Sequence, residues 1–258
     1  MANAKSSITL TAIPGLPAIR EGDNLGSMLV DALLTARLEP QPGDVLIITH
    51  KIVSKAEGRV VALDDVQSSS AAIELARKTE KDPAVVELIL SESKKIIRHR
   101  PGLIIAEHRL GIVMANAGID QSNVGGGAGE HRVLLLPRNP DQSSEMIARA
   151  LQRRFQCDVA VIIADSVGRA WRNGIVGLAI GAFGLPALLD LRGRRDLDGR
   201  DLEVTQVGLA DEIASAAELL MGEADEARPA VLMRGMTWEG EAQPASALIR
   251  SEAEDMFR

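Results

Sequence analysis

The chain has 258 residues, enough for one large domain or two small lobes, and its hydrophobic fraction of 46% permits a sizeable core. Only 2% of the residues are aromatic, so that core must be aliphatic. The net charge of −7 argues against generic nucleic-acid binding. The single cysteine, Cys157, excludes an internal disulfide framework and suits a reducing cytoplasm.

Hydrophobic patterning predicts interspersed strands and helices along the whole chain. The expected order in the first half is a strand at 8–13, a helix from 25, a strand at 45–48, helices at 68–81 and 83–95, and strands at 103–106 and 110–115. The second half is expected to form strands at 133–136 and 159–164, a helix at 141–155, a strand at 203–207, a helix at 210–221, a strand at 229–233 and a helix at 251–257. Because pairs that resemble hairpins interrupt a strict βαβ alternation, the pattern favours an α+β fold with a mixed sheet over a Rossmann fold.

No segment has the character of a signal peptide or a membrane span. The longest uncharged run, 173–189, is shorter than a bilayer span and contains four glycines and a proline. The sequence therefore predicts a cytoplasmic protein without a membrane partner.

The stretch 159–184 carries the clearest chemical signal. It opens with the apolar run 159–164, which is typical of a strand buried on both faces. Asp165 and Ser166 follow where such a strand would surface, and Arg169 and Arg172 come next. A carboxylate beside a hydroxyl suits a hard cation, although an aspartate that caps a following helix is an alternative explanation.

Two further segments place a carboxylate after an apolar element, at Asp120 and at Glu223. Oxygen ligands of this kind suit Mg²⁺ or Mn²⁺, and nearby cations such as Lys55 would neutralise phosphate charge. The Walker lysine motif is absent, and the glycine run 124–129 has the spacing of neither phosphate-loop fingerprint. The residues alone predict an enzyme that handles a metal and a phosphate, and they name no substrate.

Several long strings resemble the coenzyme F420-0:γ-glutamyl ligase family in order along nearly the whole chain. They are SKAEGR (54–59), NAGIDQSNV (116–124), ADSVGRAWRNG (164–174), AIG (179–181), GRDLEVT (199–205), ADEIASAAELLMGEAD (210–225) and RSEAEDMFR (250–258). The resemblance implies a GTP-dependent, metal-requiring ligase that adds L-glutamate to the deazaflavin coenzyme F420-0. It also implies an unusual α+β fold that is neither a Rossmann nor a P-loop fold, in a homodimer with the site near the subunit contact. Residues 1–258 would form one domain, or two lobes of it, without the C-terminal flavin-binding domain of some relatives.

The resemblance also implies a set of site residues. Those expected to contact GTP are Gly15, Leu16, Pro17, His50, Lys55, Asn123, Met221, Gly222, Glu223, Ala224, Asp225, Glu226, Ala227 and Arg228. Those expected to hold Mg²⁺ or Mn²⁺, with K⁺ as a further candidate ion, are Asp120, Asp165, Ser166 and Glu223. Those expected to hold the anionic substrate are Arg169, Arg172, Arg194 and Arg195.

Three features depart from the family pattern. His50 stands where a small hydroxyl residue is common, and Ser166 replaces the usual threonine while keeping its oxygen. The stretch 125–132 is longer than the usual connection, so its role is open.

The implied reaction transfers the γ-phosphate of GTP to the terminal carboxylate of F420-0, and the amine of glutamate then attacks the acyl phosphate. No side chain is an evident general base for that amine. Two alternatives stay open, a metal-dependent phosphohydrolase and a non-catalytic nucleotide-binding module, of which the acidic residues together with Lys55 disfavour the second. The apolar, glycine-rich stretch 174–189 is expected to pack partly across a two-fold subunit contact.

Overall fold

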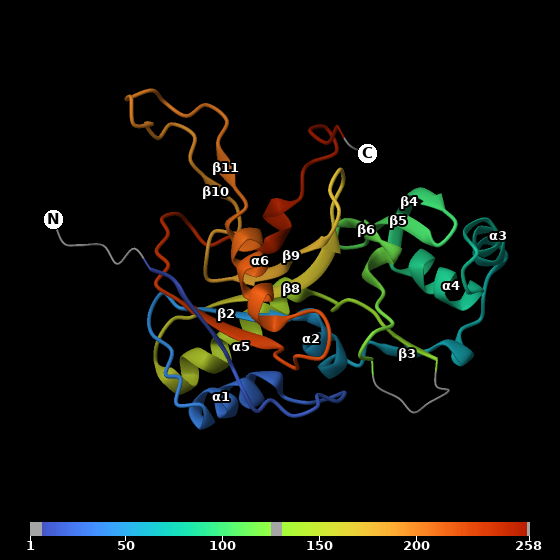
Figure 1. Cartoon of the computed structure of the whole chain (residues 1–258), viewed down its shortest axis with the longest axis horizontal. Coiled ribbons are helices and arrows are strands. Elements are labelled where there is room, and N and C mark those ends of the chain that lie inside the picture. Colours follow the sequence, from blue (N-terminus) through green and yellow to red (C-terminus); the bar gives the residue numbers. More distant parts are fainter. Residues whose placement is uncertain (1–6, 125–130, 257–258) are drawn as a thin grey trace.

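A five-stranded mixed sheet forms the centre of the protein in the computed structural model, which describes residues 7–124 and 131–256 (Figure 1). Its order is β1-β12-β2-β8-β9, with bounds Thr9–Ala12, Ala230–Arg234, Val45–Thr49, Ala160–Gly168 and Ile175–Phe183. The β2–β8 pair is parallel and the other three pairs are antiparallel. The predicted α+β class with a mixed sheet is confirmed, because Rossmann and P-loop folds are built on mostly parallel sheets.

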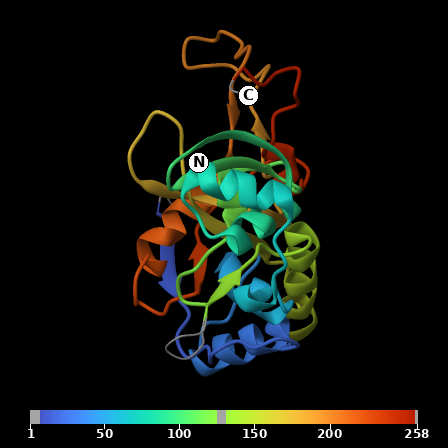
Figure 2. The same ribbon diagram turned by 90° about the vertical axis from the view of Figure 1, so that its right-hand side faces the viewer.

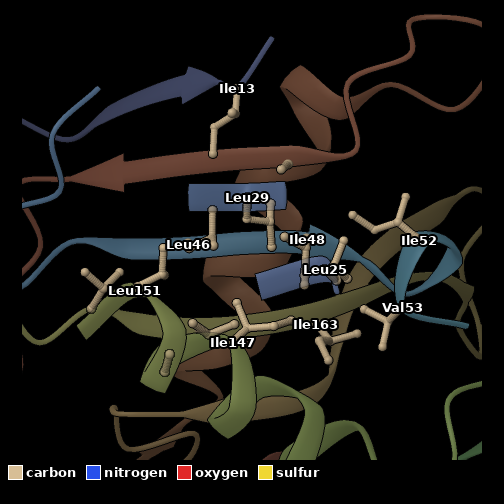
Figure 3. Packing of buried hydrophobic residues seen from close by; sticks show 14 of the residues in the cluster. Ile13, Leu25, Leu29, Leu46, Ile48, Ile52, Val53, Ile147, Leu151 and Ile163 are labelled. Carbon is tan, nitrogen blue, oxygen red and sulfur yellow. The ribbon is translucent and has the colours of Figure 1, made fainter. Parts of the chain in front are cut away.

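Helices cover both faces of the sheet. Helices α1 (Leu25–Thr35) and α5 (Pro140–Phe155) pack on one face, and α6 (Leu209–Met221) packs on the other. The side chain of Asn24 caps α1 by accepting a hydrogen bond from the Ser27 amide, as its position before an apolar helical stripe predicts. Figure 3 shows side chains from β2, α1 and α5 gathered into one aliphatic cluster.

A smaller lobe with its own hydrophobic cluster is built from residues 60–124 and 131–135. It contains β3 (Val60–Ala62), α3 (Ser70–Thr79), α4 (Pro83–Ser91), β4 (Ser93–Arg100), β5 (Leu103–His108), β6 (Val113–Ala115) and β7 (Arg132–Leu134), with the short 3-10 turns Leu63–Asp65 and Asn116–Gly118. Figure 2 views this lobe from its outer side, with α3 and α4 in front.

Three predicted boundaries in and beyond this lobe are wrong. The helix expected over 83–95 ends at Ser91, because the next residues pair with β5 as the lysine- and arginine-rich strand β4. The strand expected over 110–115 is reduced to β6 by a turn around Gly111. The helix expected over 251–257 is a series of turns in its described part, which ends at Met256.

An arm projects from the body between β9 and α6 (Figure 1). Its base is the pair β10 (Leu189–Asp190) and β11 (Gln206–Val207), and the rest is irregular, so the strand predicted over 203–207 is only its last two residues. The chain ends with β12 and a 3-10 turn, Ala245–Leu248. Within the described residues, no helix is both long and apolar enough to cross a membrane.

The strand expected at 159–164 is longer than predicted and forms a hairpin with β9. Asp165 and Ser166 therefore lie inside β8, opposite Leu178 and Gly177, and they neither follow the strand nor cap a helix. Glycines in β9 let helices approach, since a Cβ at Gly177 would lie 2.7 Å from carbonyl atoms of Ala214 in α6. The close approach at this glycine is made within the chain, and the subunit contact expected over 174–189 stays a prediction.

Candidate functional site

The parallel pairing of β2 with β8 brings the first two site residues together. Thr49 pairs with Ala164, so the residues that follow them lie side by side, His50 at the start of a helix and Asp165 still within β8. His50 opens the short helix α2 (His50–Ala56), whose N-cap is Thr49. Its Nε2 lies 3.2 Å from Asp165 Oδ1 without a hydrogen bond, and its side chain is 1% exposed. His50 is therefore a buried neighbour of Asp165.

Two lysines stand one turn apart on α2, which places them on the same side of the helix. Lys51 Nζ lies 2.7 Å from Asp120 Oδ2, and Lys55 Nζ donates to the carbonyl oxygen of Asn123 at 2.7 Å. Burial and the neighbouring charge of Lys51 lower the pKa of Lys55, against the opposing effect of Asp120. The two ammonium groups thus concentrate positive charge beside the segment 120–123.

Asp120 is held at this place by backbone and side-chain contacts. Its backbone forms an antiparallel bridge with Leu134, the last residue of β7. Its carboxylate accepts hydrogen bonds from the amide and hydroxyl of Ser122, at 2.7 and 2.8 Å. Burial alone would raise the pKa of Asp120, but the bonds from Lys51 and Ser122 outweigh it and lower that pKa. Asp120 is thus an ionised carboxylate.

A second acidic group gathers where β8 faces the end of α6. Ser166 Oγ donates to Glu223 Oε2 at 2.9 Å. Burial and the negative charges of Glu223 and Asp165 raise the pKa of Glu218 to about 7, although a hydrogen bond with Ser166 works the other way. The raised pKa of Glu218 thus reflects its burial beside two other carboxyl groups.

A cavity of about 530 Å³ lies between these groups. Every residue predicted to contact GTP lines it except Gly15 and His50, and its other lining residues are Ala18, Ile19, Thr49, Lys51, Ile52, Ala164, Ser166, Glu218 and Pro229. Cavities that bind cofactors in other proteins have volumes of roughly 300–1,000 Å³. The cavity therefore has the size and the mixed lining of a cofactor site.

The loop 222–229 forms one wall of the cavity. It begins at Gly222, whose φ of +73° lies in the left-handed region that favours glycine. Glu226 accepts a hydrogen bond from the Ala224 amide at 2.9 Å, and Asn123 Nδ2 donates to the Ala224 carbonyl at 3.3 Å. The loop is thus shaped by its own acidic residue and tied to the segment that carries Asp120.

The predicted metal ligands do not all meet. In residues 7–124 and 131–256, no three His, Cys, Asp or Glu side chains are close enough together to hold a metal ion. Ser166 donates a hydrogen bond to Glu223, and the charges of Asp165 and Glu223 both raise the pKa of Glu218. Asp120 instead forms an ion pair with Lys51. The oxygen donors of the predicted ligands fit a hard cation chemically.

The four predicted substrate arginines do not line the cavity. Arg169 and Arg172 lie in the turn between β8 and β9, and Arg194 and Arg195 lie on the arm. Arg194 pairs with Glu239 at 2.7 Å, and Arg195 Nε lies 3.9 Å from Asp201. Their roles toward a substrate stay predictions. Of the stretch 125–132, whose role was left open, residues 125–130 lie outside the described residues, and Arg132 begins β7.

Two charged residues of the cavity wall, Lys51 and Glu218, escaped the sequence prediction. Lys51 could have been found, because it lies four residues before Lys55 in a helix. Glu218 gives no such signal, because it lies in an alanine-rich amphipathic helix whose acidic residues read as a solvated face.

Comparisons with known proteins identify the family of the chain. The family model described as F420-0:Gamma-glutamyl ligase matches residues 15–235. The chain belongs to this family. It is 46% identical to the coenzyme F420:L-glutamate ligase of Methanopyrus kandleri over 98% of each chain, and 44% identical to that of Methanothermobacter thermautotrophicus over 97% of this chain and 99% of the relative. The family assignment made from the sequence strings is confirmed.

Proposed function

We propose that this member of the F420-0:γ-glutamyl ligase family joins L-glutamate to coenzyme F420-0 at the expense of GTP. The cavity carries the proposal, because it gathers two lysines, the loop 222–229 and an oxygen-rich wall on the fold of a family whose relatives are named for this ligation. The lysines would hold the nucleotide phosphates, and Leu16 and Pro17 would face its apolar part.

A carboxylate and an amine do not condense readily in water, so the carboxylate must first be activated. In the proposed first step a carboxylate oxygen of F420-0 attacks the γ-phosphorus of GTP and GDP leaves. The amine of glutamate then attacks the acyl carbon, loses a proton, and expels phosphate that carries the former carboxylate oxygen. Lys51 and Lys55 would stabilise the charge that develops on the transferred phosphoryl group.

Mg²⁺ or Mn²⁺ belongs to this proposal, with K⁺ as a further candidate. Asp165, Ser166 and Glu223 would hold the divalent ion together with Asp120, and Glu218 would add a nearby oxygen. A bound divalent ion would neutralise phosphate charge and orient the reacting oxygens. A homodimer is likewise proposed, as the resemblance implies.

Mass spectrometry of the product tests the proposal. The protein is incubated with F420-0, L-glutamate and Mn²⁺, with GTP, with ATP or without nucleotide. We expect F420-0 to gain glutamyl residues in the presence of GTP only, with one GDP formed for each amide bond. Hydrolysis of GTP without glutamate incorporation would instead identify a phosphohydrolase, and binding without either reaction would identify a nucleotide-binding module.

An isotope label tests the acyl phosphate. F420-0 whose terminal carboxylate carries oxygen-18 should pass one labelled oxygen to the phosphate that is released. Unlabelled phosphate would contradict the acyl-phosphate step while leaving the ligation itself intact.

A further inference from the structure

Trp171 is an aromatic residue that the fold does not bury. Its exposed fraction is 88%, and its φ of +68° lies in the left-handed region that a tryptophan rarely adopts. The other aromatic residues in the described part of the chain, Phe155, Phe183 and Trp238, are partly buried against hydrophobic clusters. Exposure of the apolar ring to water and the left-handed backbone both cost free energy, and residues with strained backbones concentrate at functional sites.

The hairpin between β8 and β9 connects this indole to the candidate site. The last backbone pair is Gly168 with Ile175, and Trp171 lies in the turn beyond it, which stands clear of the body in both views (Figures 1 and 2). Ser166, in the cavity wall, precedes Trp171 by five residues. Since an extended residue spans about 3.3 Å, the backbones of Trp171 and Ser166 are at most about 17 Å apart. An elongated ligand whose end lies beside Ser166 can therefore follow the hairpin to the indole.

The surroundings of Trp171 are cationic. Arg169 and Arg172 flank it, and Arg169 Nη1 is buried without a hydrogen-bond partner. The adjoining residues Ala170, Asn173 and Gly174 are exposed and offer no apolar patch, and Ile175 is the next large apolar side chain along the turn. A ring with an anionic tail fits an indole between two guanidinium groups better than a second copy of the chain does, because the core of a protein–protein interface is depleted of charge.

We propose that Trp171 stacks on the deazaflavin ring of F420-0 and that Arg169 and Arg172 hold the anionic tail, which directs the terminal carboxylate along the hairpin toward the cavity. The inference rests on the proposed function and assigns to the hairpin the part of the substrate that does not react. It makes Trp171 a binding residue that takes no part in the chemical steps.

Binding and turnover of three variants test this inference. The dissociation constant of F420-0 is measured by the polarisation of the deazaflavin fluorescence, with GDP and Mn²⁺ present, for the wild type, Trp171→Ala and Trp171→Phe. Stacking of a base on an aromatic side chain is worth about 1–3 kcal/mol, so Trp171→Ala should weaken binding roughly tenfold or more. Trp171→Phe keeps a ring and should retain most of the affinity. In the wild type, F420-0 should quench tryptophan emission, and in Trp171→Phe the remaining Trp238 should respond little.

A matched control is Met146→Ala, which removes another exposed apolar side chain, on α5, and should leave F420-0 binding unchanged. In turnover, Trp171→Ala should raise the KM for F420-0 and leave the KM for GTP and the saturated kcat near their wild-type values. Equal dissociation constants for the wild type and Trp171→Ala would overturn the stacking. A changed molar mass by light scattering with unchanged F420-0 binding would show instead that Trp171 is a contact between copies.

The inference and the proposed function fail differently. Glutamate incorporation with Trp171→Ala binding F420-0 as tightly as the wild type would overturn the stacking alone. Tight F420-0 binding that depends on Trp171, without incorporation of glutamate, would overturn the ligase activity alone.

Discussion

At the scale of single residues, the candidate site separates its charges into two groups. Lys51 and Lys55 line the cavity from α2, and Ser166, Glu218 and Glu223 line it from β8 and the end of α6. The lowered pKa of Lys55 and the raised pKa of Glu218 have the same origin, since burial is the largest cause of both and like charges add to it. A nucleotide bound with a cation would neutralise both groups, because its phosphates would pair with the lysines and the cation would pair with the carboxylates.

Lys55→Ala tests the cationic group. Because a hydrogen bond to a charged group contributes about 1.5–3 kcal/mol, we expect the KM for GTP to rise, or kcat/KM to fall, by roughly tenfold or more. Thermal stability should change little, since Lys55 has one hydrogen-bond partner, the Asn123 carbonyl. Steady-state kinetics with varied GTP provides the measurement.

Lys78→Ala is the matched control, because Lys78 forms an exposed pair with Glu74 on α3, away from the cavity. It should leave GTP dependence unchanged. If Lys55→Ala also behaves like the wild type, Lys55 is only a tether for the segment at Asn123.

The residue scale also shows what sequence strings can supply. The strings that resemble the family contain Lys55, Ser166 and part of the loop after α6, and the structure places these residues at the cavity. The strings could not supply the pairing of Lys51 with Asp120, or the effect of Asp165 and Ser166 on Glu218, because these residues are far apart in the sequence. Contacts of that kind become visible only once the strands have a register.

At the scale of elements, the hairpin of β8 and β9 positions the acidic wall. The apolar run 159–164 predicted the buried half of β8, but nothing local predicted that the strand continues through Asp165 and Ser166. Its continuation is fixed by pairing with β9 and by the helix that lies over it. Gly177 is central to that packing, since it faces α6 where Ala214 and Glu218 approach.

Gly177→Ala tests this packing. Its Cβ would meet backbone atoms of Ala214 at 2.7 Å and the Glu218 carboxyl carbon at 2.9 Å, so α6 must shift. Overpacking of this kind costs about 1–3 kcal/mol of unfolding free energy, which urea denaturation measures. Gly168→Ala on the same hairpin is the control, because nothing lies within 4 Å of a Cβ there. Equal stabilities of the two variants would contradict the tight approach of α6.

At the scale of the whole molecule, the cavity is assembled from both lobes. The larger lobe contributes α2, Ser166 of β8 and the loop 222–229 after α6. The smaller lobe contributes Asn123, whose segment 120–123 is bridged to β7 through Asp120 and Leu134. A buried ionic network holds the lobes together close to α2. Glu92, after α4, faces Arg59 at 2.7 Å, His108 at 3.3 Å and Arg109 at 3.0 Å.

This network makes the free energy of unfolding depend on pH in the acidic range. Burial alone would raise the pKa of Glu92, but His108, Arg59 and Arg109 outweigh it and lower the pKa to about 2 from an ordinary value of 4.5. Because the folded pKa lies below the unfolded one, the contribution is complete above about pH 4.5 and is lost as the pH falls toward 2. A shift of this size corresponds to up to about 3 kcal/mol of unfolding free energy.

Glu92→Gln removes this dependence. We expect the variant to lose about 3–5 kcal/mol near neutral pH, because Arg59 and Arg109 lose their buried carboxylate. Its stability should fall less steeply than that of the wild type between pH 4.5 and 2, as urea denaturation at several pH values would show. Glu74→Gln, which breaks only an exposed pair on α3, should be nearly as stable as the wild type and keep its pH profile. Parallel pH profiles for Glu92→Gln and the wild type would show that the acid sensitivity arises elsewhere, and that the lobes are joined by apolar contacts such as those of Leu136 and Met114 with the main cluster.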